Sequence, residues 1–321
     1  GANRGVERAA KGGKGGGGDT TTFPNLDCPQ IVEADLLHGE GIDGTGVTVA
    51  VVDSGHYSHR NLNKNADGQT RMLANYDAIA DVLNEYNPLA GTDSAGHGSH
   101  VSGIVANSDN IGTNRDPRYA GVAPNADLIS VKAFDSDGRG TYADVIRGLQ
   151  FLLDTQATHG TDVVNLSFSA APQSYYWDDP LNQAVMRLWQ AGIVVVASAG
   201  NEGPEPMTIG LPGNVPYVIT VGATGDYKLP VTDTDDYVAV FSSAGPTVEG
   251  FVKPEVIAPG SQVVSMMETS SEIAVAHPEY HDGSIYFFMS GTSQSAAVVT
   301  GIVALMLDHS PWLSPDEVKY R

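Results

Sequence analysis

The feature that most constrains the fold of this 321-residue chain is a series of short, almost wholly apolar runs. The runs 46–52 (GVTVAVV) and 194–198 (VVVAS) are rich in β-branched residues, as is typical of strands buried on both faces of a parallel sheet. Helical segments alternate with these runs, which predicts an α/β fold: a doubly wound, mostly parallel sheet with helices on both faces. Strands are expected to end near Val52, Val131, Leu166, Val196 and Val221.

A longer apolar run, 291–309 (GTSQSAAVVTGIVALMLDH), has the length of a buried helix. Ser293 would lie in its first turn, beside unpaired backbone N–H groups and the positive end of the helix dipole. Both would stabilise negative charge near the serine oxygen. Serine is also a preferred N-cap, so from this segment alone a catalytic and a capping role stay open.

Two earlier segments supply an acid and a base. Asp53 follows the run 46–52, at the end of a strand where open α/β sheets place ligands, although it could also be a turn or cap residue. His97 opens a helix of small residues, and its alternative is an ordinary surface histidine. His100 is expected to be structural, because three positions along a helix turn it away from the face of His97.

Together these residues predict nucleophilic catalysis. A serine is a poor nucleophile until an adjacent base removes its proton, and imidazole titrates near neutral pH. A carboxylate would hold the imidazole in one tautomer. Asp53, His97 and Ser293 therefore form a candidate triad in the chain order Asp, His, Ser.

The segments VAVVDSG, GHGSHVSGIVA, VVNLSF, VVVASAGN and MSGTSQSAA resemble, in the same order, the block motifs of subtilisin-like serine proteases. The resemblance implies a secreted serine endopeptidase that hydrolyses peptide bonds through an acyl-enzyme on Ser293. It also implies that the Asn201 side chain and the Ser293 backbone N–H bind the oxyanion, whereas the alternative for Asn201 is an Asx turn. Two other functions stay open: an acyl-transfer enzyme (a peptide ligase or macrocyclase) and a catalytically silent binding module.

The resemblance extends to a substrate cleft. Segment 138–140 would pair with an extended substrate, while 167–169 and 198–200 would line the S1 pocket, with Glu202 at its rim. We expect broad specificity with a preference for large apolar P1 residues, and Glu202 would add tolerance for basic ones. Arg139 would favour acidic residues at distant subsites or is plain solvated surface. The implied cleft residues are Gly138, Arg139, Gly140, Ser167, Phe168, Ser169, Ser198, Ala199, Gly200 and Glu202.

Five positions in two segments depart from the family pattern. Gln294-Ser295-Ala296-Ala297 replaces the usual Met-Ala-Ser/Thr-Pro, and the missing proline predicts a straighter, better-bonded helix. Gln294 and Ser295 would need hydrogen-bond partners if buried. Ser169 stands where the family commonly has glycine, which would narrow the cleft.

Structural calcium, not needed for the chemistry, is the cofactor that the resemblance implies. Such cations bind carboxylate and carbonyl oxygens in loops. One candidate is the loop 107–113, with Asn110, Ile111 and Thr113, although Asn61 stands where an aspartate is expected. The other candidate pairs Glu255 with carbonyl groups at Pro216 and Val218. Simple solvation of these acidic loops is the alternative.

Composition limits the partners. Lys and Arg total 17 against 38 Asp and Glu, a net charge of −21, which argues against nucleic acid and anionic membranes. No apolar run reaches the length of about 18 residues that a membrane span needs. The chain has a single cysteine, Cys28, so an intrachain disulfide is excluded. Cys28 is expected to lie in a loop. We expect a monomer that acts on proteins and peptides.

Two segments are expected: a flexible, glycine-rich stretch at 1–24 and a catalytic domain at 25–321. The resemblance implies a signal peptide and an inhibitory propeptide upstream, neither of which this sequence contains. The segment 313–321 begins a capped helix and stops inside it, so a C-terminal continuation is expected.

Overall fold

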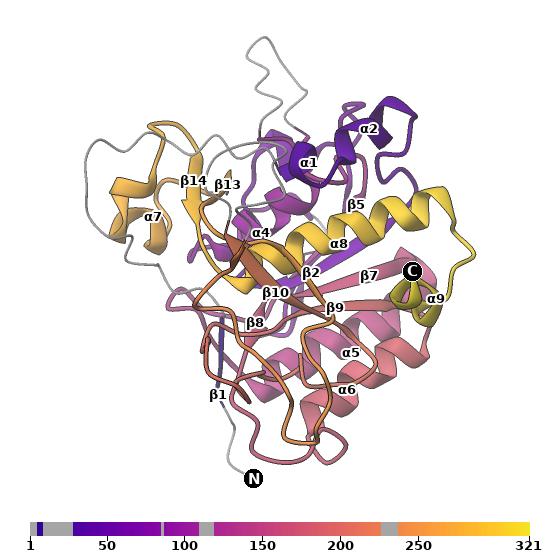
Figure 1. Cartoon of the computed structure of the whole chain (residues 1–321). Helices are drawn as coiled ribbons and strands as arrows, with labels where there is room; N and C mark the ends of the chain where they lie inside the picture. Colours follow the sequence, from indigo (N-terminus) through magenta and orange to yellow (C-terminus); the bar gives the residue numbers. More distant parts are fainter. Residues whose placement is uncertain (1–4, 9–27, 85–86, 109–118, 226–236) are drawn as a thin grey trace.

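The computed structural model describes residues 5–8, 28–84, 87–108, 119–225 and 237–321, and a twisted β-sheet forms its centre (Figure 1). The strands of this sheet are β2 (Thr48–Asp53), β3 (Met72–Asp77), β4 (Val82–Leu83), β5 (Asp127–Lys132), β7 (Thr161–Leu166), β9 (Val194–Ser198), β10 (Ile219–Gly225), β11 (Tyr237–Val238) and β12 (Val256–Pro259). Their order is β11-β10-β9-β7-β2-β5-β3-β4, with β12 also paired to β10. Pairing is parallel from β10 to β3 and antiparallel at β11 and β4. The predicted doubly wound, mostly parallel sheet is confirmed.

Long helices cover both faces of the sheet (Figure 1). Helices α4 (His97–Ala106) and α8 (Thr292–His309) lie on one face, and α5 (Tyr142–His159) and α6 (Pro180–Gln190) lie on the other. The α8 helix runs without interruption over its 18 residues, as the missing proline predicted. The shorter helices are α1 (Cys28–Ile31), α2 (Ala34–Gly39), α3 (Arg60–Asn63), α7 (Glu272–Ala276) and α9 (Pro315–Tyr320), with a 3-10 turn at Pro278–Tyr280.

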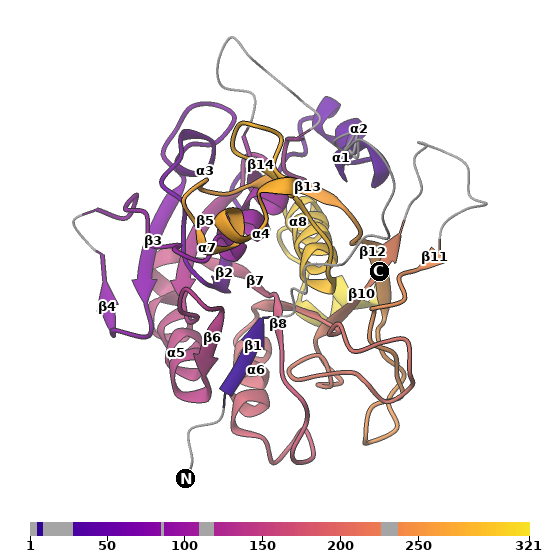
Figure 2. The same cartoon turned by 90° about the vertical axis from the view of Figure 1, so that its left-hand side faces the viewer.

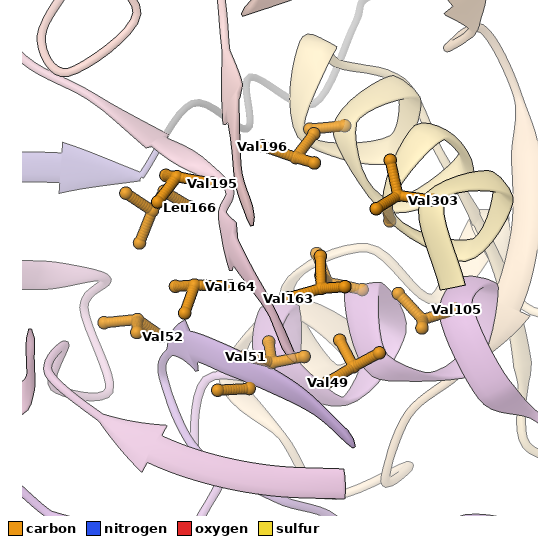
Figure 3. Packing of buried hydrophobic residues seen from close by; sticks show 14 of the residues in the cluster. Val49, Val51, Val52, Val105, Val163, Val164, Leu166, Val195, Val196 and Val303 are labelled. Atoms are coloured by element: carbon orange, nitrogen blue, oxygen red, sulfur yellow. The ribbon is translucent and has the colours of Figure 1, made fainter. Parts of the chain in front are cut away.

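Valine side chains fill both interfaces between the sheet and the helices (Figure 3). Val49 and Val51 of β2 face Val105 of α4 and Val303 of α8, whereas Val52 points to the opposite side. Every residue of β2 is buried. A strand covered on both faces has no solvent-facing positions, so residues 49–52 of β2 are all apolar instead of alternating with polar ones.

Two sequence expectations about chain ends have clear outcomes. The helix α9 begins after Ser314, whose hydroxyl accepts the Glu317 N–H while the Glu317 side chain reaches back, so the predicted capped helix is confirmed. Cys28 opens helix α1 and is buried, so its placement in a loop was wrong. The side chain packs into the main hydrophobic core, which favours an ordered turn there.

Two small sheets flank the main one. The antiparallel strands β13 (Val263–Met266) and β14 (Tyr286–Met289) form one of them, and β13 packs against α4. The second sheet has the order β6-β1-β8, formed by β6 (Arg139–Thr141), β1 (Gly5–Arg8) and β8 (Phe168–Ser169) (Figure 2). β1 lies within the stretch 1–24, which was predicted to be flexible. Its four residues instead form a strand that is paired on both sides. The other residues of 1–24 lie outside the described part of the chain.

Candidate active site

Three neighbouring strands, β2, β7 and β9, end at one edge of the sheet, and polar residues stand at or just after each end. Asp53 ends β2, Ser167 follows β7, and Asn201 comes shortly after β9. Neighbouring strands in a sheet are about 4.8 Å apart. The topology therefore gathers these residues at the carboxyl edge, where doubly wound sheets hold their ligands.

An acid–base pair lies at the end of β2. The Nδ1 atom of His97 is 2.7 Å from Oδ1 and 2.9 Å from Oδ2 of Asp53, and both side chains are buried. Because Nδ1 faces a carboxylate, we assign the ring proton to Nδ1, which leaves a lone pair on Nε2. Among the described residues this buried Nε2 atom has no hydrogen-bond partner. It is therefore available to accept a proton from a ligand or a nucleophile.

A second carboxylate, Asp93, holds the start of α4. Its Oδ1 accepts hydrogen bonds from the Gly96 N–H and the Ser54 hydroxyl, each at 2.8 Å. Its Oδ2 accepts the Ser99 N–H at 2.8 Å and the Ser99 hydroxyl at 2.5 Å. His97 is the first residue of α4. By holding the start of this helix, Asp93 fixes the position of the His97 imidazole. Sequence reasoning missed it, although an aspartate just before a helix start is a common capping signal.

Ser293 lies in the first turn of α8 and is fully buried. The N-cap of this helix is Gly291, so the capping role for Ser293 is wrong. The Ser293 hydroxyl donates to the Ser167 carbonyl at 3.0 Å, and the Ser167 hydroxyl donates back to the Ser293 carbonyl at 2.9 Å. The Asn165 amide in turn donates to Ser167 Oγ at 2.8 Å. This reciprocal pair fastens the start of α8 to the end of β7, one strand away from Asp53.

Thr292, the first residue of α8, orients the Asn201 side chain. Asn201 Oδ1 accepts the Thr292 N–H at 2.9 Å and the Thr292 hydroxyl at 3.0 Å, so Asn201 Nδ2 points away from Thr292. Nδ2 is buried and has no partner within the described residues. An unpaired buried donor costs about 1–3 kcal/mol and is rare in folded proteins. The Asx turn is wrong, because Oδ1 is used by Thr292 and the Gly203 N–H donates to Phe241.

Comparison with known sequences decides the family. A profile described as "Subtilase family" matches residues 44–321. This chain belongs to the subtilase family. It is 40% identical over 289 residues to the serine protease AprX of Bacillus subtilis, a match that covers 88% of this chain and 62% of AprX. It is 33% identical over 294 residues to subtilisin DY of Bacillus licheniformis, covering 91% of this chain and 87% of that protein.

Solved structures agree. A structure titled "S41 Psychrophilic Protease" matches with a TM-score of 0.68 and 27% identity, covering 87% of this chain and 82% of that one. A cold-adapted subtilisin-like serine proteinase matches with a TM-score of 0.62 and 27% identity, covering 87% and 81%. The chain thus has the sequence motifs and the fold of subtilisin-like serine peptidases, and its Asp53–His97 pair is consistent with a catalytic triad.

The predicted substrate-pairing edge, which lies in β6, and the predicted S1 wall, which contains β8, lie on either side of β1 (Figure 2). Val6 pairs with Gly140 of β6, and Arg8 pairs with Phe168 of β8. Gly140 has no room for a side chain, since an added Cβ would lie 2.4 Å from the Ala133 carbonyl oxygen. Only glycine fits at this position of β6, whose backbone pairs with β1.

The two predicted walls of the S1 pocket are joined by a hydrogen bond from the Ser198 hydroxyl to the Phe168 carbonyl at 3.0 Å. A Cβ on Gly200 would lie 3.0 Å from Ser169 Oγ, and one on Gly210 would lie 1.9 Å from it. The Ser169 hydroxyl therefore fills space that opens when glycine stands at this position.

The remaining cleft residues are peripheral. Glu202 is exposed, and its backbone N–H donates to Ser243 Oγ at 3.1 Å. Arg139 is exposed and lies 3.8 Å from an Asp137 carboxylate oxygen.

Three buried polar residues near the catalytic centre, His100, Gln294 and Ser295, differ in their hydrogen bonding. His100 is buried, its Nε2 lies 3.1 Å from the Phe287 carbonyl, and burial lowers its pKa to about 3, so it is neutral and structural, as expected. Ser295 found its partner, since its hydroxyl donates to the Ala258 carbonyl at 2.9 Å. Gln294 is fully buried with both amide atoms unpaired in the described part of the chain, and nothing in the structure explains it.

The two candidate calcium sites differ. Asn110, Ile111 and Thr113 lie outside the described residues. At the second site the carbonyl oxygens of Pro216 and Val218 and the Glu255 carboxylate do converge, but they surround the Lys319 ammonium. The oxygen donors suit a hard cation, yet the lysine already fills their centre, so these residues do not fit calcium. Elsewhere in the described ranges no group of His, Cys, Asp and Glu is arranged to hold a metal ion.

Among the described residues, no helix combines the length and the apolar character required to cross a bilayer.

Proposed function

We propose that this chain is a serine endopeptidase that binds an extended protein segment and cleaves it through an acyl-enzyme on Ser293. The observation that supports this most is β1. Gly5–Arg8 pairs antiparallel with β6 on one side and with β8 on the other, as the central strand of a small sheet. Pairing along both edges holds a backbone of any sequence, which suits an enzyme that cuts within chains.

The direction of β1 also fits proteolysis. Its residues run from Gly5, opposite Thr141, to Arg8, opposite Phe168. Ser167, whose carbonyl accepts the Ser293 hydroxyl, comes immediately before Phe168. A substrate lying in this direction would lead its next carbonyl carbon toward the nucleophile.

Activation of Ser293 requires its hydroxyl to leave the Ser167 carbonyl. A substrate N–H that donates to this carbonyl would displace it, and a rotation about the Cα–Cβ bond would turn the hydroxyl toward His97 Nε2. His97 then accepts the proton as Oγ bonds to the substrate carbonyl carbon, and Asp53 stabilises the imidazolium. His97 returns the proton to the leaving amine as the peptide bond breaks, and water attacks the acyl-enzyme in the same way.

The negative charge on the substrate oxygen would be bound by the Asn201 amide and the Ser293 backbone N–H. The unpaired, buried Nδ2 of Asn201 supports this role. Such a donor is already oriented by Thr292, so little reorganisation accompanies the reaction.

The P1 preference is proposed as broad and apolar, with Ser169 limiting the largest side chains. Its hydroxyl lies against Gly200, on the opposite wall of the S1 pocket. Replacement by glycine (Ser169→Gly) should raise kcat/KM for Phe or Tyr at P1 relative to Ala by roughly 3- to 10-fold. Profiling both proteins on one peptide library measures this ratio, and an unchanged ratio contradicts a role for Ser169.

We also propose that the enzyme acts outside the cell as a monomer, after an N-terminal inhibitory segment leaves the cleft. The pairing of Gly5–Arg8 with both β6 and β8 supports such a segment, and the net charge of −21 suits a freely soluble enzyme. Fractionation of the native cells, with size-exclusion chromatography of the enzyme, tests location and oligomeric state. A structural calcium ion at the loop 107–113 stays part of the proposal.

The reaction is tested by digesting an unfolded protein with the wild type and with Ser293→Ala, in the presence and absence of an added amine nucleophile. We expect internal cleavage with mainly hydrolysed products, and none from the variant. Mainly amine-coupled products would favour an acyl-transfer enzyme. Failure of a phosphonofluoridate to label Ser293 would favour a silent binding module.

A further inference from the structure

The oxygen atoms around the second candidate calcium site bind an ammonium group. Lys319 Nζ donates to the Pro216 carbonyl at 2.7 Å, the Val218 carbonyl at 2.8 Å and Glu255 Oε1 at 2.6 Å. An ammonium group has three N–H donors, so every donor of Lys319 is paired.

A second lysine shares two of these oxygens. Lys253 Nζ donates to the Val218 carbonyl at 3.0 Å and the Thr220 hydroxyl at 2.8 Å, and it lies 2.6 Å from Glu255 Oε1. Its side chain is only 1% exposed. The other carboxylate oxygen, Oε2, accepts the Thr220 N–H at 2.9 Å. We call Lys253, Glu255 and Lys319, together with the carbonyls of Pro216 and Val218, the lysine cage.

The charges of the lysine cage match those of a metal site. When both lysines are protonated, the two ammonium groups and the one carboxylate carry the same formal charge as one divalent cation beside one carboxylate. The distances of 2.6–2.8 Å from Lys319 Nζ are those of charge-assisted hydrogen bonds. Calcium needs oxygen atoms at about 2.3–2.6 Å. The oxygen atoms are thus spaced for an ammonium nitrogen, although oxygen atoms of these kinds also bind calcium in other proteins.

The lysine cage connects distant parts of the chain. Lys319 belongs to α9, whereas its partners Val218 and Glu255 lie 101 and 64 residues earlier, at the start of β10 and just before β12. A second contact of α9 is the hydrogen bond from Trp189 Nε1 to Asp316 Oδ1 at 2.8 Å. Lys319 therefore ties this helix to the end of the sheet, as a bound cation ties loops together in other proteins.

We infer that Lys319 is a built-in replacement for a metal ion at the lysine cage. It holds α9 on the sheet without calcium at this position. Removing its side chain exposes a ready set of oxygen ligands, and so creates a calcium-binding site that the wild type lacks.

The test compares Lys319→Ala, which empties the centre of the cage, with Lys319→Met, which removes the charge but keeps it filled. Ser293 is blocked with phenylmethylsulfonyl fluoride to prevent self-digestion. Thermal unfolding is followed by circular dichroism in EDTA and in 10 mM CaCl2, and calcium binding is measured by titration calorimetry. The calcium response of the wild type is subtracted throughout, so a metal site elsewhere does not affect the result.

In EDTA both variants should melt below the wild type. Calcium should raise the Tm of Lys319→Ala by roughly 2–4 °C more than that of the wild type, with one additional ion bound per molecule, and should not do so for Lys319→Met. Adding Lys253→Met to Lys319→Ala should strengthen the response, because one repelling charge is gone. Adding Glu255→Gln should abolish it.

The inference is overturned if Lys319→Ala responds to calcium no more than the wild type, or if Lys319→Met responds equally. It is also overturned if the response survives Glu255→Gln. A Lys319→Ala protein that folds only with calcium present supports it. Because the readouts are melting and binding, these outcomes do not depend on the proposed proteolytic activity.

Discussion

At the catalytic centre, His97 Nε2 and Asn201 Nδ2 are buried and unpaired within the described residues, whereas at the lysine cage both ammonium groups use every N–H they have. Both regions join the end of the sheet to a helix distant in sequence. An unpaired buried donor or acceptor costs about 1–3 kcal/mol, so folding alone selects against it. In these two regions, the fully paired ammonium groups stabilise the fold, whereas the unpaired atoms of His97 and Asn201 are free to bind a substrate.

The strongest test of this contrast uses two buried serines of α8. Ser293→Ala should lower kcat about a million-fold, the magnitude known for the nucleophile of subtilisin, a relative of this chain. Ser295→Ala, the matched control, removes the hydrogen bond to Ala258 and should lower the free energy of unfolding by about 1 kcal/mol with kcat nearly unchanged. Steady-state kinetics and urea unfolding measure both. A large loss of kcat in the control would break the contrast.

Asn201 gives the next largest effect. Replacing it with leucine removes the free donor and should lower kcat about a hundred- to a thousandfold, as for the equivalent change in subtilisin, with KM little altered. Leu also loses the bonds to Thr292, so Asn201→Asp, which keeps the Oδ1 acceptor, is the companion variant. Because the aspartate repels an oxyanion, it should be at least as slow. Normal turnover in the aspartate variant would remove Asn201 from the oxyanion site.

Asp93 tests whether a saturated group beside the catalytic centre behaves structurally. Asp93→Ala removes the acceptor for Gly96, Ser99 and Ser54 and should lower the free energy of unfolding by about 2 kcal/mol. The imidazole then loses its fixed position, so kcat should fall while the pH at half-maximal kcat stays constant. A shifted pH profile would instead assign Asp93 a direct electrostatic role.

The last test concerns protonation at the lysine cage and affects stability alone. Burial lowers the pKa of the Lys253 ammonium from 10.5 to about 7. Between these pH values the unfolded chain holds a proton that the folded chain has released, so raising the pH favours folding, by at most about 1.4 kcal/mol per pH unit. Urea unfolding of the inhibited enzyme from pH 7 to 10 should show this rise, and Lys253→Met should lack it. Identical slopes would mean that the cage retains all its protons.

Much of the catalytic centre could be predicted because its signals are local. A continuous apolar run ending in Asp53 indicates a buried strand with a carboxylate at its end, and a run of small residues after His97 indicates a closely packed helix. Family motifs then supplied roles for Ser293 and Asn201. Asp93 had a local signal that was overlooked, whereas the direction of the Ser293 hydroxyl had none.

The lysine cage marks where sequence reasoning stops. The oxygen ligands at Pro216, Val218 and Glu255 were predicted together, but the cation between them was expected to be calcium and is the Lys319 ammonium group. Lys319 lies on a surface helix, where a lysine is ordinarily solvated, so nothing nearby in the sequence indicates that its ammonium group binds the sheet.

The sequence by itself determined the order of strands and helices, the residues at their ends and hence the family and its chemistry, because side-chain periodicity and short-range sterics set these features. The tertiary structure alone decided which polar atoms were left without partners. It paired Ser293 with Ser167 across 126 residues and filled a metal-like cage with Lys319 from 101 residues away. Pairings of this kind depend on how elements distant in sequence pack against one another, and no short segment of the sequence contains that information.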